Sequence, residues 1–173
     1  VLHLPTADGG LEYTAESASI ELGAVGPLSA ALVVTAQVGG MLVKSTITLY
    51  AFLDRVDICN QIHKKALAER CQVEFAFPFH VPARQFRLEH PGVILDPETE
   101  MRPGAGLSAA VVRHFVDVFN TEYGVTLSMA DSFLVQFGRR TTTEDPQSLD
   151  ASATLLALAM GNIYDANEAI RDQ

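Results

Sequence analysis

The sequence contains no tryptophan and only two cysteines, and both features limit the kinds of site that the chain can form. Sugar-binding modules need flat aromatic rings that stack on the ligand, so the lack of tryptophan disfavours an autonomous carbohydrate-binding module. Cys59 and Cys71 each lie in a candidate strand, and they form neither a CxxC pair nor a zinc-like cluster. We expect both to be free, buried thiols of an intracellular protein, with a disulfide as the alternative.

Positive charge is also scarce. Twelve Lys and Arg residues stand against 21 Asp and Glu residues, a net charge of −9. This balance argues against a nucleic-acid partner or an anionic membrane surface, because both require a basic face. No apolar run reaches the roughly 18 residues that a transmembrane helix requires. The first ten residues lack the charged and apolar regions of a signal peptide, so we expect a cytoplasmic protein, and the missing initiator methionine suggests an excised part of a larger one.

Long helical periodicity is missing too, and the clearest pattern is that of a strand from Cys71 to Val81. Its odd positions are all apolar and include Phe75, Phe77 and Phe79, whereas its even positions are polar, small or proline. This period of two predicts a strand with one face in a core and one face in water. Pro78 has no N–H to donate, so we expect an edge position or a bulge there.

Further stretches along the chain show strand patterns, and about nine to eleven strands are expected in all. The other candidates are Leu11–Tyr13, Ala18–Leu22, Ala30–Val38, Met41–Tyr50, Phe52–Ile62, Arg84–Leu88, Val111–Phe119 (expected to be central), Tyr123–Met129, Ser132–Phe137 and Thr154–Met160. The pair Gly39-Gly40 predicts a hairpin turn, and Asn60 is a polar residue on the apolar side of its strand. All phenylalanines except Phe52 are expected in the core. The sequence therefore predicts one mainly β domain over residues 1–173, an antiparallel β-sandwich with a long loop from Leu88 to Gly106.

No catalytic constellation accompanies this pattern. The spacing of His80, His90 and His114 matches no metal-ligand motif, so we expect no metal site. The carboxylates that could form a glycosidase pair sit beside turn residues, and we expect them to be solvated; they are Asp96, Glu98, Glu100, Asp131, Glu144 and Asp145. A phosphate-binding loop and a GxSxG nucleophile motif are both missing. The exposed aromatic candidates for sugar binding are Tyr50, Tyr123 and Tyr164.

Taken in order, several motifs resemble the C-terminal β-domains of glycoside hydrolase family 38, the α-mannosidases and their relatives. The similar segments are Asp54–Lys65 (DRVDICNQIHKK), Phe75–Val81 (FAFPFHV), Arg102–Gly104, Val111–Gly138 and Gly161–Gln173 (GNIYDANEAIRDQ). The resemblance covers roughly residues 45 to 173 and implies part of a two-sheet supersandwich of the galactose-mutarotase-like type. In that family the divalent metal, typically zinc, and the catalytic residues belong to a barrel. The resemblance thus implies a chain that is inactive alone and needs no cofactor of its own. Its partners would be the barrel of the same polypeptide and that enzyme's carbohydrate substrate.

The last segment departs from the family pattern. Gly161-Asn162 replaces the family's Asn pair, Tyr164 replaces a Trp, and Asn167 matches a later Asn. Because this loop lies towards the barrel in the family, Asn162, Tyr164 and Asn167 are the candidate residues on the substrate side, and the departures imply a different glycoside preference. The family continues with more strands beyond the position of Gln173, which implies a sandwich that is incomplete at its C-terminus.

Two other functions stay open. The chain could be a free-standing carbohydrate-binding β-sandwich, or an oligomerisation module in which a sheet face or edge forms a homo-oligomer.

Overall fold

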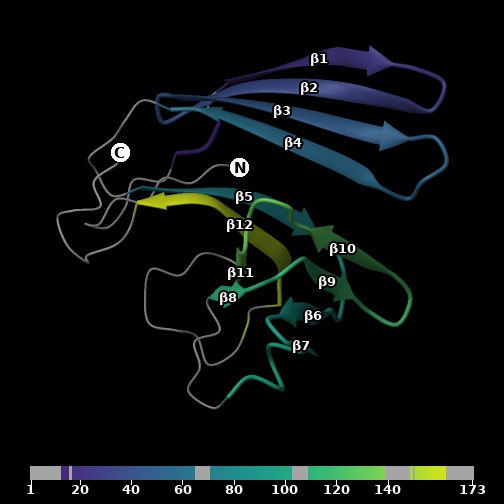
Figure 1. The fold of residues 1–173 in the computed structure, drawn as a ribbon, viewed down its shortest axis with the longest axis vertical. Helices are drawn as coiled ribbons and strands as arrows, with labels where there is room; N and C mark the ends of the chain where they lie inside the picture. Colours follow the sequence, from purple (N-terminus) through teal and green to yellow (C-terminus); the bar gives the residue numbers. More distant parts are fainter. Residues whose placement is uncertain are drawn as a thin grey trace.

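The computed structural model describes residues 13–15, 17–64, 71–102, 109–138, 149 and 151–162, and strands dominate this part of the chain (Figure 1). Twelve strands and no helix occur in the described ranges. They form three antiparallel sheets of four strands each, which confirms a mainly β, sandwich-like fold. A single core between two sheets was expected, and the third sheet divides that core in two. No helix in the described ranges is long and apolar enough to cross a bilayer.

The N-terminal sheet is a four-stranded meander. Its strands follow one another in sequence and in space as β1 (Ser17–Val25), β2 (Ser29–Val38), β3 (Met41–Tyr50) and β4 (Val56–His63). Gly39 and Gly40 have φ angles of 53° and 78° and join β2 to β3, as the hairpin prediction required. The fourth strand begins at Val56 and not at Phe52, because residues 51–55 are the turn from β3, and Phe52 is exposed as expected.

The two remaining sheets are built from strands distant in sequence. One has the order β5 (Cys71–Phe79), β12 (Ala153–Asn162), β11 (Leu134–Phe137), β8 (Ala109–Val111). The other has the order β10 (Gly124–Ser128), β9 (Phe115–Phe119), β6 (Gln85–His90), β7 (Val93–Leu95). The candidate strand Thr154–Met160 is confirmed as part of β12.

Two expectations for this region were wrong. Val111–Phe119 is not one central strand, because residues 112–114 separate β8 from β9 and the two strands belong to different sheets. The segment from Leu88 onward is not only loop, since β6 continues to His90 and turns at Gly92, with a φ of 90°, into β7.

Two hydrophobic clusters hold the sheets together. The larger lies between the sheets of β6–β9 and β11–β12, where the rings of Phe86 and Phe137 meet edge to face with centroids 4.9 Å apart. The smaller joins one end of the N-terminal sheet to β5 and β12. Its buried members are Val38, Met41, Val43 and Val73.

Strand β5 contributes to both clusters. Phe75 packs against the smaller cluster, and Phe77 and Phe79 pack against the larger, so the predicted apolar face is confirmed. Its other face was predicted to meet water, but Gln72 and Glu74 are 3% and 0% exposed. Alternation defines two faces without showing whether another part of the protein covers the polar one.

Strand β5 lies at the edge of its described sheet, and Pro78 there is exposed, as predicted.

Two predicted core side chains lie in solvent instead. Cys59 is an exposed free thiol on β4, and Phe133 is exposed in the bend before β11. Cys59 was expected to be buried as a free thiol of an intracellular protein, but it lies on an open sheet face. Phe133 was expected to face inward from strand alternation, but it precedes its strand. Cys71 is paired with Asn162 at the start of β5, and its side chain lies outside the described part.

Candidate functional site

The residues predicted to face a substrate lie at or beyond the end of the last strand. Asn162 is the final residue of β12, opposite Cys71 on β5. Tyr164 and Asn167 lie outside the described residues. The strand therefore fixes where this segment starts.

The three histidines suspected as metal ligands have separate surroundings. The Nδ1 atom of His90 lies 2.9 Å from the carbonyl oxygen of Val111, and that of His114 lies 2.8 Å from Oε2 of Glu89. His80 is exposed, and its backbone oxygen accepts a hydrogen bond from Tyr123. In the ranges that the structure covers, no three His, Cys, Asp or Glu side chains gather into a metal-binding group.

Three of the candidate carboxylates stabilise a turn after β7. Asp96 Oδ1 accepts from the N–H of Glu98 at 2.8 Å, and Glu100 Oε2 accepts from the N–H of Asp96 at 2.7 Å. Glu98 also accepts a 2.6 Å bond from Nη1 of Arg84, whose guanidinium lies over the ring of Phe86. These contacts make the segment a structural turn. Asp131 is exposed elsewhere, and Glu144 and Asp145 are outside the described residues.

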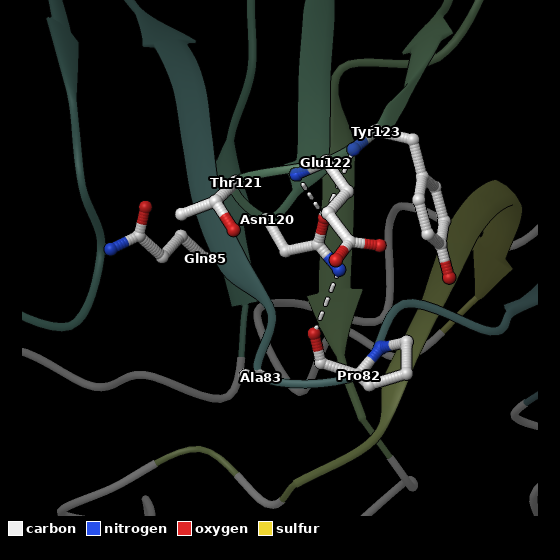
Figure 2. Close-up of a pocket in the computed structure, with 7 residues that line it drawn as sticks. All are labelled: Pro82, Ala83, Gln85, Asn120, Thr121, Glu122 and Tyr123. Atoms are coloured by element: carbon white, nitrogen blue, oxygen red, sulfur yellow. Dashed lines mark hydrogen bonds between the residues drawn. The ribbon is translucent and has the colours of Figure 1, made fainter.

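A pocket of about 400 Å³ opens where the β5–β6 loop meets the β9–β10 turn (Figure 2). Its volume is within the range of small-molecule sites. The lining residues are Pro82, Ala83, Gln85, Asn120, Thr121, Glu122 and Tyr123.

Asn120 holds the two sides of the pocket together. Its Oδ1 accepts from the N–H groups of Glu122 and Tyr123, at 2.8 and 3.0 Å, which forms the turn. Its Nδ2 donates to the carbonyl oxygen of Pro82 at 3.0 Å (Figure 2). Its carbonyl oxygen and one of its two amide hydrogens are thus used inside the protein, which makes Asn120 a structural residue of the pocket.

Tyr123 forms a second connection. Its hydroxyl donates to the carbonyl oxygen of His80 at 2.9 Å, so the ring is fixed at the pocket wall while 46% of the residue remains exposed. Ala83, on the opposite loop, has a φ of 49°, which non-glycine residues adopt uncommonly. The next residue after Tyr123, Gly124, has no room for a side chain, because an added Cβ would lie 2.7 Å from Cβ of Phe119.

Three polar side chains of the pocket are free to bind a ligand. No hydrogen bond to another described residue engages the side chains of Gln85, Thr121 and Glu122. They offer an amide, a hydroxyl and a carboxylate beside an aromatic ring (Figure 2). These groups can donate hydrogen bonds to a ligand and accept them from it.

The other exposed-tyrosine candidate has a different role. Tyr50 is half-buried, and its hydroxyl donates to Oδ2 of Asp57 at 2.6 Å. Arg55 donates to both oxygens of the same carboxylate. These hydrogen bonds, first from Arg55 and then from Tyr50, lower the pKa of Asp57, while the bond to Asp57 raises the pKa of Tyr50. Tyr50 is therefore committed to an ion-pair cluster, and Tyr164 lies outside the described residues.

Sequence reasoning named Tyr123 but not its neighbours in the pocket. Asn120 begins the stretch Asn-Thr-Glu-Tyr-Gly, which is a recognisable turn signal. No sequence signal connects it with Pro82 and Gln85, because folding brings together two loops almost forty residues apart.

Comparison with protein-family models gives no match. No curated protein matches the chain either.

Proposed function

We propose that this chain is the non-catalytic C-terminal β-domain of a family-38-like, α-mannosidase-related glycosyl hydrolase. In this proposal it packs against a catalytic barrel of the same cytoplasmic polypeptide and helps to shape the active site. The supporting observation is the placement of the similar segments. Three of the similar segments contain the strands β4, part of β5 and β9–β11, and a fourth begins at the end of β12; these strands follow one another in order and belong to antiparallel sheets, as such a domain requires.

The proposed contact with the active site is the segment that leaves β12. Asn162 ends that strand, and Tyr164 and Asn167 follow it in sequence. A tyrosine in place of the family's tryptophan offers a smaller ring with a hydroxyl, which would change the sugars accepted. In this proposal, the segment after β12 and the barrel together contact the substrate, and these contacts determine which sugar is accepted and which linkage is cleaved.

The zinc of such an enzyme would belong to the barrel and not to this chain. In the described ranges no three metal-ligating side chains come together. The proposal gives the chain no cofactor and no catalytic residue.

An activity assay tests this part of the proposal. The purified 173-residue chain should not hydrolyse an aryl α-mannoside, either alone or with added Zn²⁺. Hydrolysis that follows the folded protein through purification would contradict the proposal.

A second candidate function is supported by the pocket beside Tyr123. A fixed aromatic ring and three uncommitted polar groups are the elements with which proteins bind sugars, and the pocket volume of about 400 Å³ accommodates a small sugar. We infer that, in this alternative, the chain is a free-standing carbohydrate-binding sandwich whose ligand contacts Gln85 and Thr121.

Calorimetric titration with mannose-containing oligosaccharides tests the alternative. Heat of binding should disappear in the double variant Gln85→Ala/Thr121→Ala and persist in Ser19→Ala, a matched hydroxyl loss at an exposed position on β1. The absence of binding in the unchanged chain would contradict this second candidate and leave the first intact.

A further inference from the structure

The pairing of strands β1–β4 assigns each residue of the N-terminal sheet to one of two faces, because directly opposite residues point to the same side. Two complete rows on one of these faces are aliphatic. The first row is Leu22, Leu32, Ile47 and Ile58, and the second is Val25, Ala30, Leu49 and Val56. Ile20 adjoins the first row from β1. We refer to these nine residues as the aliphatic face.

Most of the aliphatic face lies in solvent. Its large side chains on β1 and β4, together with Leu32 and Leu49, are between 38% and 71% exposed. The turns at the same end of the sheet add Leu28, Phe52 and Leu53, which are also exposed. Together these residues expose at least several hundred Å² of contiguous apolar surface, which is as large as the largest patch on a typical monomer or larger and marks an interaction site.

At the other end of the N-terminal sheet, the same side already contacts the sheet that contains β5 and β12. Val38, Met41 and Val43 pack there against Val73 of β5 in the smaller hydrophobic cluster. Figure 1 shows the N-terminal sheet extending past the ends of β5 and β12, with the turns β1–β2 and β3–β4 at its free end. The aliphatic face is therefore the uncovered continuation of a sheet-on-sheet contact.

We propose that the aliphatic face binds the same face of a second copy of this chain, related by a two-fold axis. A two-fold contact requires one surface that complements itself, and a flat aliphatic sheet face does so by packing on its equivalent about 10 Å away. A stable interface needs roughly 800 Å² from each partner, so the contact would include the neighbouring turns as well as the aliphatic face.

Charge also favours a second copy. The chain carries a net charge of −9, yet the aliphatic face contains no ionisable side chain. Two copies can therefore meet there without burying carboxylates opposite one another. The opposite face of the sheet carries Glu21, Lys44 and Asp57 and could not pack in this way. An anionic lipid surface is disfavoured as the occupant by the acidic net charge.

Sedimentation equilibrium of the full chain across a range of concentrations tests this inference. The unchanged chain should form dimers. Leu22→Lys and Ile58→Lys each place a charge in the contact and should raise the dimer dissociation constant by roughly tenfold or more. Two variants of the same strands carry the same charge on the opposite face, where Ser19→Lys and Gln61→Lys should leave the dissociation constant unchanged.

All four positions are exposed, and circular dichroism verifies that each variant folds. A chain that stays monomeric at several hundred micromolar would overturn the inference, as would equal effects of lysine on both faces. The inference does not rest on the proposed hydrolase role, and neither result depends on glycosidase activity.

Discussion

Ser45 and Asn60 lie opposite each other on β3 and β4, and the hydroxyl of Ser45 donates a 2.6 Å hydrogen bond to Oδ1 of Asn60. This polar pair marks a boundary on one side of the N-terminal sheet. Beyond it in one direction, Val43 and Ile62 pack in the smaller core, and in the other direction Ile47 and Ile58 belong to the aliphatic face. The hydroxyl proton of Ser45 and Oδ1 of Asn60 are therefore paired within the sheet and need no partner from a second chain.

Acidification should remove the stabilisation that Asp57 provides. Arg55 and Tyr50 lower the pKa of Asp57 in the folded protein below the ordinary carboxyl value of 3.8. The ionised carboxylate therefore stabilises the fold at pH values above 3.8, and this stabilisation is lost as the pH falls through the lowered pKa of the folded protein. We expect Asp57→Asn to lower the melting temperature at pH 6, and the difference from the unchanged chain to shrink below pH 3.8.

Thermal melts across this pH range check the prediction, with Asp54→Asn as the control. Asp54 is an exposed carboxylate in the turn that precedes β4, and its replacement should leave the melting temperature nearly unchanged across this pH range. If the difference in melting temperature between Asp57→Asn and the unchanged chain grew on acidification, the ionised carboxylate of Asp57 would not be the source of the stabilisation.

Gly124 should tolerate no side chain. An alanine Cβ there would lie 2.7 Å from Cβ of Phe119, so either β9 or β10 must shift. We expect Gly124→Ala to lower the free energy of unfolding by about 1–3 kcal/mol, measured by urea denaturation.

The matched substitution is Gly26→Ala in the β1–β2 turn. An added Cβ would lie 3.8 Å from the carbonyl oxygen of Ser29, which is an ordinary contact. Its effect should stay within about 0.5 kcal/mol. Equal effects of the two alanines would show that the close approach of β9 and β10 is wrong.

The buried face of β5 should depend on Gln72. Its side-chain amide donates to Oε1 of Glu74, and both residues are buried. Replacing Gln72 by methionine keeps the length of the side chain but removes a donor to a buried carboxylate, which should cost about 1–3 kcal/mol. The same change at the exposed Gln61 should cost less than about 0.5 kcal/mol, again by urea denaturation. An unchanged stability of Gln72→Met would mean that Glu74 does not depend on this amide.

Local features of the fold were predictable because local chemistry decides them. The strand alternation of β5 and the Gly39-Gly40 turn involve residues that are neighbours in sequence, and both predictions are confirmed. The burial of Gln72 and Glu74 depends instead on what covers the second face of β5. The separation of β8 from β9 likewise depends on which sheet each strand joins.

The same distinction applies to the sites. Tyr123 could be named from sequence as an exposed aromatic residue, but its pocket needs Asn120 to reach Pro82 across a distance of 38 positions along the chain. The aliphatic face was missed for a related reason. Alternation in β1–β4 indicated an apolar side, and only the three-dimensional arrangement shows that β5 and β12 cover one end of it.

The proposed role as a hydrolase domain is tested most directly on the native protein. Antibodies raised against the 173-residue chain should precipitate from its source cells a polypeptide much larger than 18.7 kDa, together with metal-dependent hydrolysis of an aryl α-mannoside. Excess recombinant chain should compete away both. Recovery of an 18.7 kDa protein without that activity would contradict the account.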